Sequence, residues 1–159
     1  MPNKLDAIDR RILTALQSDG RLQNIELARE VGLSPSPCLR RVKALEAGGV
    51  IDRYAALLSG PAVGLPLVIF VRVTLERQDK DGVTSFAETI SKVPEVLECY
   101  LMAGTYDYLL KVAAADLEDY QRFQMEHLTP LPWVRNVVSE IPLKHVKSTT
   151  VLPLANPDR

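Results

Sequence analysis

The first third of the chain has apolar residues at helical spacing. Residues 5–16 place one at every third or fourth position, which predicts an amphipathic helix that ends near Gly20. A second helix is predicted over residues 24–32, with Asn24 as its N-cap, and a third over residues 34–47. The link between these two is short and contains a glycine, which predicts a helix-turn-helix. The apolar positions of the first helix are Leu5, Ile8, Ile12 and Leu16.

The third helix begins with two prolines, Pro35 and Pro37, although proline breaks helix interiors. The first N–H groups of a helix have no partner within it, so proline loses little there, and its fixed φ suits a helix. With Ser34 as N-cap, the cap hydroxyl is expected to reach only the N–H of Ser36, because Pro37 has none. The pattern therefore predicts a stiff, sharply defined start.

This third helix has two contrasting faces. Cys38, Val42 and Leu45 form an apolar stripe that is expected to pack on the other helices. The opposite face is small and polar at its tip and then cationic, which is the plan of a recognition helix in a DNA major groove. The alternative is a solvated helix face without a partner. The residues predicted to contact DNA are Ser34, Pro35, Ser36, Pro37, Arg40, Arg41 and Lys43.

After residue 66 the pattern changes to strands alternating with helices. Strands are predicted over residues 67–75, 95–104, 107–115 and 133–143, and helices over residues 81–93 and 116–128. The order βαββαβ is that of a ferredoxin-like unit. The predicted fold class is α+β, with an N-terminal helix-turn-helix (winged-helix-like) domain and a C-terminal ferredoxin-like domain.

The predicted sheet is apolar on both faces. Val68 and Phe70 alternate with Ile69 and Val71 in the first strand, and the second hairpin strand behaves likewise. Two helices cover one face only, so a second copy of the chain is the economical cover for the other. The sequence therefore predicts at least a homodimer.

The domain boundary is placed where glycine and proline concentrate. Residues 59–66 read as a linker, preceded by a strand over residues 50–58. The predicted division is a helix-turn-helix domain with a hinge strand over 1–58, the linker, and an effector-binding and oligomerisation domain over 67–159.

Composition bounds the remaining possibilities. The chain has 159 residues, 47% hydrophobic and 25% charged, which is typical of a globular protein. The start lacks the apolar stretch of a signal peptide, and Cys38 and Cys99 show no pairing pattern, so a cytoplasmic location is expected. Net charge is −1, with nine Lys and Arg against seven Asp and Glu in residues 1–58. Whole-chain charge therefore does not decide whether DNA is a partner.

The turn between the second and third predicted strands is the candidate ligand site. Gly104 allows close backbone approach, free N–H groups can hold a carboxylate, and Asp107 can face an ammonium group. Leu101 and Met102 could contact an aliphatic side chain. The alternative is a plain hairpin turn, which Gly-x-x-Asp also favours. Ser139, on the last strand, is a weaker candidate for the same pocket.

Other chemistry is not expected. His127 and His145 have no cysteine or carboxylate at metal-ligand spacing, so no metal or other cofactor is predicted. Cys38 and Cys99 are interpreted as packing residues. Asp6 and Asp9 are interpreted as acids at a helix start, and no enzyme activity is predicted.

With these elements in place, the sequence resembles the Lrp/AsnC (feast/famine) transcriptional regulators. The resemblance rests on "LDAIDRRILTALQSDGR", "NIELAREVGLSPSPCLRRVKALEAGGVI" and "GTYDYLLKV", and covers about residues 5–154. It implies a double-stranded DNA partner, an amino acid effector bound in a so-called RAM domain, and dimers that assemble further, often to octamers. It carries the effector site onto Gly104, Thr105, Tyr106, Asp107 and Tyr108.

One departure from the family and two alternatives qualify this resemblance. The family often has an acidic residue after the turn glycine, where this chain has Thr105. Sirohaem decarboxylases resemble the same two-part architecture, although the cationic helix and the scarcity of histidines argue against such an enzyme. A second domain that only oligomerises is the other alternative.

Overall fold

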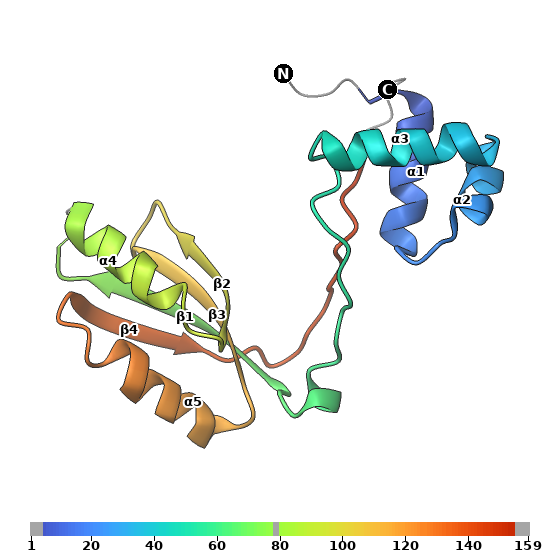
Figure 1. Cartoon of the computed structure of the whole chain (residues 1–159). Helices are drawn as coiled ribbons and strands as arrows, with labels where there is room; N and C mark the ends of the chain where they lie inside the picture. Colours follow the sequence, from blue (N-terminus) through green and yellow to red (C-terminus); the bar gives the residue numbers. More distant parts are fainter. Residues whose placement is uncertain (1–4, 78–79, 155–159) are drawn as a thin grey trace. The chain divides into compact units, whose positions relative to one another are not determined.

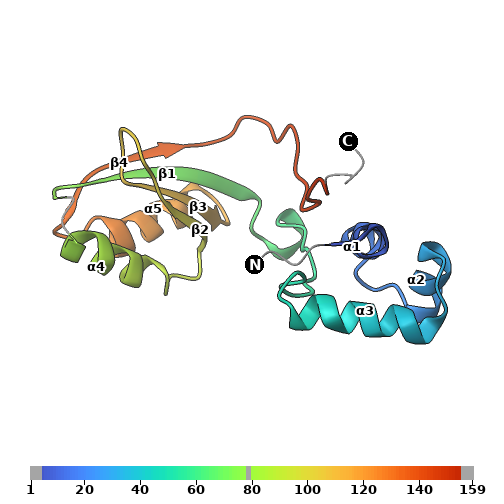
Figure 2. The same cartoon turned by 90° about the horizontal axis from the view of Figure 1, so that it is seen from above.

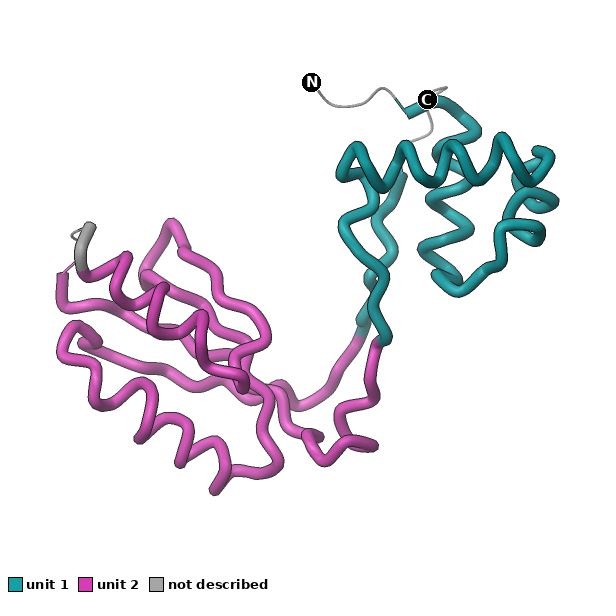
Figure 3. Tube along the Cα trace, viewed as in Figure 1, with its two compact units in different colours: residues 1–56, 147–159 teal, residues 57–146 magenta. Residues whose placement is uncertain are grey.

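The computed structural model describes residues 5–77 and 80–154. These residues form two compact units (Figure 3). The first contains residues up to Ala56 and again from Lys147, and the second spans Leu57–Val146. The predicted division assigned the whole C-terminal end to the second domain. The end of the chain instead belongs with the helices of the first unit, because its side chains pack there.

The first unit contains α1 (Ala7–Ser18), α2 (Asn24–Val31) and α3 (Pro35–Ala47), close to the predicted spans (Figure 1). The N-cap of α2 is Gln23 rather than Asn24, and the structure therefore corrects that assignment by one residue. Gly32 ends α2 at φ 73°, a left-handed conformation that favours glycine. The apolar stripes of the three helices share one core of Ile12, Leu13, Ala15, Leu27, Ala28, Val31, Cys38 and Leu45.

The start of α3 is held differently from the prediction. Ser34 is the N-cap and Pro35 the first helical residue, but the Ser34 side chain makes no capping hydrogen bond. The predicted bond from the Ser36 N–H to the Ser34 hydroxyl is therefore absent. The Asn24 side-chain amide donates instead to the Pro35 carbonyl at 2.8 Å, which ties the beginning of α2 to the beginning of α3.

The segment between the units carries no strand. Residues 52–59 have neither helix nor strand hydrogen bonding, so the prediction of a strand over residues 50–58 is wrong for the single described chain. A strand requires a hydrogen-bonded neighbour as well as a suitable sequence. Within the predicted linker, Pro61–Val63 forms a 3₁₀ turn, η1, which Gly64 ends at φ 82°.

The second unit is a four-stranded antiparallel sheet in the order β2-β3-β1-β4. Its elements are β1 (Leu67–Leu75), α4 (Lys80–Ile90), β2 (Val96–Leu101), β3 (Tyr108–Ala114), α5 (Leu117–Phe123), its π-helical continuation η2 (Gln124–Leu128) and β4 (Val134–Glu140). This is the predicted βαββαβ order. Both α4 and α5 lie on one face of the sheet (Figure 2).

The two faces of this sheet differ in character. The face under the helices is buried and apolar, with Ile69, Val71 and Val73 of β1 fully covered. The open face alternates with it and is only half-buried along β1. The sequence analysis expected this face to be apolar throughout. That expectation is wrong, because the ion pairs Arg72–Glu140 and Lys111–Glu98 lie on it. The open-face residues are Val68, Phe70, Arg72 and Thr74 of β1 and their register partners Leu109, Lys111, Ala113, Asn136, Val138, Glu140, Glu98 and Tyr100.

The end of the chain returns to the first unit. The Gln17 side chain of α1 pairs with the backbone of Leu152, accepting from its N–H at 2.6 Å and donating to its carbonyl at 3.3 Å. Leu154 packs against the first unit's core. A segment 135 residues away in sequence thus completes the surface of α1.

Candidate functional sites

The face of α3 opposite the core is open to solvent. Cys38 and Leu45 are buried on one side, and burial raises the pKa of the Cys38 thiol. On the other side Ser36, Arg40 and Lys43 are exposed. These three residues lie three or four positions apart, so they share one line along the helix. Of the remaining predicted contacts, Ser34 and Pro35 are also exposed and Pro37 is half-buried.

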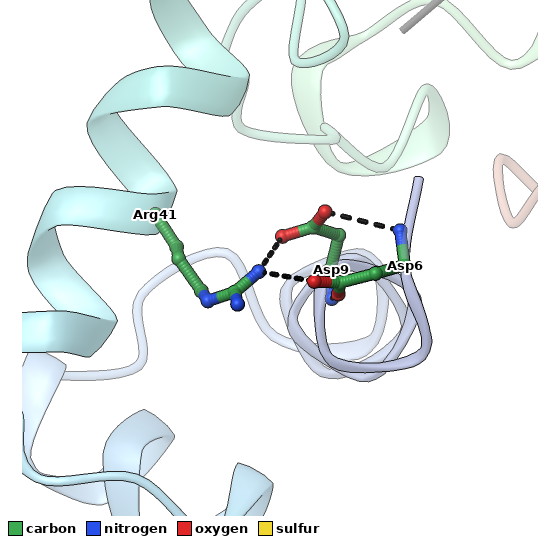
Figure 4. Close-up of polar contacts among 3 residues, drawn as sticks. All are labelled: Asp6, Asp9 and Arg41. Carbon is green, nitrogen blue, oxygen red and sulfur yellow. Dashed lines mark hydrogen bonds and ion pairs between the residues drawn. The ribbon is translucent and has the colours of Figure 1, made fainter. Parts of the chain in front are cut away.

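Arg41 lies apart from that line. Its Nη1 atom contacts Asp6 Oδ2 at 2.7 Å and Asp9 Oδ1 at 2.8 Å, both at the beginning of α1 (Figure 4). The predicted DNA contact therefore has its guanidinium engaged within the domain. Sequence reasoning recognised the two aspartates as acids at a helix start, but not their link to α3.

The two aspartates also cap α1. The Asp9 N–H donates to Asp6 Oδ1 at 2.8 Å, and the Asp6 N–H donates to Asp9 Oδ2 at 3.2 Å, which is a reciprocal capping box. The Asp9 N–H, and then the Arg41 guanidinium, lower the pKa of Asp6 below its ordinary value. Hydrogen bonds to Asp6 and then to Asp9 raise the pKa of Arg41. Both shifts favour the charged forms of Asp6 and Arg41, as expected for an ion pair.

The second candidate site, the turn before β3, is organised by Asp107. This residue is 6% exposed, and its Oδ2 accepts a hydrogen bond from the Leu75 N–H at 2.7 Å. Its own N–H donates to the Val73 carbonyl at 2.9 Å, and its carbonyl accepts from the Met102 N–H at 2.8 Å. Asp107 thus joins the turn to the end of β1. The carboxylate that the sequence analysis assigned to a ligand ammonium group accepts a backbone hydrogen bond within the fold.

Two other predicted effector residues are also part of the framework. The Tyr108 hydroxyl donates to the Val83 carbonyl on α4 at 2.8 Å, and its ring lies 4.5 Å from that of Phe86. Ser139 faces α5, where its hydroxyl makes a short hydrogen bond with the Tyr120 hydroxyl. Burial is the main cause that raises the pKa of both Tyr108 and Tyr120.

The other five predicted effector residues are at least partly exposed. Leu101, Gly104 and Thr105 are exposed, and Met102 and Tyr106 are half-buried. A Cβ added to Gly104 would have no heavy atom within 4 Å, so the space above it is open.

Arg72 is a neighbour of the turn that sequence reasoning missed. Its guanidinium lies 5.5 Å from the centre of the Tyr106 ring and 2.7 Å from Glu140 Oε1. The only signal in the sequence was a single cation within the apolar stretch "LVIFVRVTL".

Of a pocket, a metal site and a membrane-spanning helix, the part of the chain that the structure describes contains only a pocket. A shallow pocket in the second unit is lined by Glu76, Arg77, Gly82, Pro132 and Trp133, and the predicted effector residues are not part of its wall. Within residues 5–77 and 80–154, no three His, Cys, Asp or Glu side chains gather at a spacing suited to a metal ion. No helix in that part of the chain is long and apolar enough to cross a membrane.

Comparison with known proteins agrees with both halves of the architecture. A winged helix-turn-helix DNA-binding family matches residues 5–52, and the Lrp/AsnC ligand binding domain matches residues 68–152. The second match alone covers more than half of the chain. The chain belongs to the Lrp/AsnC family of transcriptional regulators. The predicted resemblance and the predicted α+β fold class are thereby confirmed.

Relatives of this Lrp/AsnC regulator span almost its full length. The leucine-responsive regulatory protein of Klebsiella pneumoniae is 42% identical over 148 residues, which are 93% of this chain and 90% of the relative. A transcriptional regulator of Neisseria meningitidis, solved in complex with L-Met, is 45% identical with a TM-score of 0.90, covering 94% of this chain and 96% of that one. A feast or famine regulatory protein of M. tuberculosis, solved with L-methionine, is 33% identical with a TM-score of 0.82, covering 93% and 98%. These names support a transcriptional regulator over a sirohaem decarboxylase.

Proposed function

We propose that this regulator reads duplex DNA with the exposed line of α3. Ser36 at the helix tip meets base edges, and Arg40 and Lys43 reach bases or phosphates. The observation that carries this proposal is the exposure of these three side chains on a helix whose first turn contains Pro35 and Pro37. The match of residues 5–52 to a DNA-binding family supports it.

Replacing Arg40 tests the DNA-contact face. Arg40→Gln is expected to weaken binding to a selected duplex by roughly tenfold or more, because one good arginine–base contact contributes about 1–3 kcal/mol. The matched control Arg122→Gln removes the same charge from α5 and leaves DNA affinity unchanged. Gel shift gives the affinity, and sedimentation verifies that the variant assembles as the wild type does. Equal affinity of Arg40→Gln and wild type would refute the assignment.

The effector that we propose is a free amino acid with an aliphatic or thioether side chain, such as leucine or methionine. It binds against the exposed turn residues, where backbone N–H groups hold its carboxylate and Leu101 and Met102 contact its side chain. The relatives' names and their L-methionine complexes support this class of ligand. Asp107 serves here by shaping the turn, since its carboxylate accepts from Leu75.

Ligand-induced stabilisation tests this part of the proposal. L-leucine or L-methionine should raise the melting temperature at fixed protein concentration, whereas L-aspartate and L-lysine should not. Gly104→Val projects into open space, because a Cβ at this position meets no heavy atom within 4 Å, so it should abolish the shift and keep the basal melting temperature. Ala115→Val, outside the turn, is the control. Should no amino acid raise the melting temperature, the second domain serves assembly alone.

We further propose that a second copy of the chain covers the open face of the sheet, that such dimers assemble further, to an octamer, and that the protein acts in the cytoplasm. Phe70 supports the dimer because it lies half-buried at the centre of that face, between its register partners Lys111 and Glu140. Phe70→Glu should place a carboxylate at the centre of the proposed interface, where it must be desolvated, and yield monomers in analytical ultracentrifugation. Gln121→Glu, on the exposed side of α5, should leave the dimer intact. A dimeric Phe70→Glu variant would contradict this interface.

A further inference from the structure

We propose that Arg41 is a positioning residue, and that its contact with Asp6 and Asp9 sets the seating of α3 for sequence discrimination. This inference rests on the proposed function, in which the adjacent Arg40 and nearby Lys43 meet DNA. It assigns Arg41 a role distinct from theirs.

The first argument is the geometry of the two carboxylates. Each uses one oxygen for the cap of α1 and the other for Arg41, so all four oxygens have defined partners. The capping bonds also hold the two carboxylates at the beginning of α1. A single guanidinium nitrogen then meets both within 2.8 Å (Figure 4). The pair therefore forms a socket that accepts one side chain of α3.

The second argument concerns how α3 is otherwise held. Cys38 and Leu45 of this helix are buried, Val42 packs partly buried against the same core, and the Asn24 side chain holds the Pro35 carbonyl. Because the apolar contacts lie along a single stripe, a polar contact to one side of that stripe adds resistance to rolling of the helix about its own axis. Arg41 projects from the side of α3 toward α1, so its contact opposes such a roll. The roll angle decides where Arg40 and Lys43 point, because all three side chains project from the same two turns.

The third argument is electrostatic. Two aspartates and one arginine carry a net charge of −1 at the beginning of α1. A cation that is over-neutralised in this way is poorly suited to attract a phosphate group. The two roles predict opposite signs for Asp9→Asn: losing a negative charge should tighten DNA binding if only charge matters, and should weaken specific binding if the socket positions α3.

The experiment measures affinity at several salt concentrations for two duplexes. One is a duplex that the wild-type protein selects from a random pool, and the other is a scrambled duplex of the same composition. The slope of log affinity against log salt falls by about 0.9 for each phosphate contact that is lost. The full-length variants are Arg41→Gln, Asp9→Asn, the double variant and Arg40→Gln.

For the positioning role, Arg41→Gln and Asp9→Asn should each lower the ratio of specific to scrambled affinity by about tenfold, with the salt slope on scrambled DNA unchanged. The double variant should be no worse than Arg41→Gln alone, because that variant has already lost the contact with Asp9. Asn can still accept the Asp6 N–H, so Asp9→Asn keeps the cap of α1 and reports even where Arg41→Gln folds poorly.

Two results would overturn the inference. One is a salt slope whose magnitude is smaller by about one for Arg41→Gln, together with equal losses of affinity for both duplexes. That result would make Arg41 a phosphate contact. The other is tighter binding of both duplexes by Asp9→Asn. Arg40→Gln separates these outcomes from failure of the proposed function: if it binds both duplexes as the wild type does, the DNA-contact face itself is wrong.

Discussion

The buried carboxylate of Asp107 provides the sharpest test of how the effector turn is built. Asp107→Ala removes the acceptor of the Leu75 N–H, in a residue that is 2% exposed. A buried donor that loses its acceptor costs about 1–3 kcal/mol, and hydrogen bonds to charged groups lie toward the upper end. For a domain of this size each kcal/mol lowers the melting temperature by about 4–8 °C. A loss of roughly 10 °C is therefore expected without any ligand.

The assay is thermal unfolding of the full chain at fixed protein concentration. Asp107→Asn keeps an acceptor for the Leu75 N–H and should lose less than Asp107→Ala. Thr105→Ala, in the same turn but exposed, should change stability by no more than about 0.5 kcal/mol. An Asp107→Ala variant that melts with the wild type but no longer responds to amino acids would refute the structural role and restore the carboxylate to the ligand.

Three further predictions concern the first unit. Because the folded-state pKa of Asp6 is lowered, the stability that this residue contributes is present above its ordinary pKa and is lost as pH falls through the folded value. Asp6→Asn should therefore narrow the difference between the free energies of unfolding measured in urea at pH 7 and at pH 3. An unchanged difference would contradict the contact. Gln17→Ala should destabilise the first unit by about 1 kcal/mol and speed protease cleavage within residues 147–152, since two hydrogen bonds to Leu152 disappear; cleavage at the wild-type rate would mean that another contact holds the end of the chain. Gly32→Ala should cost about 1 kcal/mol in urea unfolding, from backbone strain alone, because no atom lies within 4 Å of the added Cβ; full stability would show that α2 ends in another conformation.

Local patterns sufficed for the elements of this chain. The apolar stretch 67–75 became β1 with the predicted bounds, and α1 to α3 begin and end within about two residues of prediction. The reason is that periodicity, caps and glycine stops act within a few residues. The predicted strand over residues 50–58 failed for the converse reason. Its apolar residues are compatible with a strand, but only a hydrogen-bonded neighbour makes one, and the sequence does not show that neighbour.

The candidate sites depended on contacts that local patterns do not contain. Asp107 and Leu75 are 32 positions apart, and Arg41 lies 35 positions from Asp6. Whether a carboxylate faces a ligand or a backbone N–H is decided by strand register, which places the start of β3 opposite the end of β1. The sequence therefore placed the turn on the fold but did not reveal that its most buried side chain accepts a hydrogen bond from the Leu75 N–H.

Adjacent arginines in α3 show why charge must be counted by face. Successive helical residues differ by about 100° around the axis, so Arg40 and Arg41 point in different directions. One is exposed, and the other meets two carboxylates of α1. Of the three cations in residues 40–43, Arg40 and Lys43 are therefore exposed, and Arg41 is engaged within the domain. In the proposed function, the contribution of α3 to the salt dependence of DNA binding therefore comes from two cations rather than three, since only cations that displace counterions from phosphates count. A recognition helix with a modest charge must then depend on how accurately its few exposed side chains are placed.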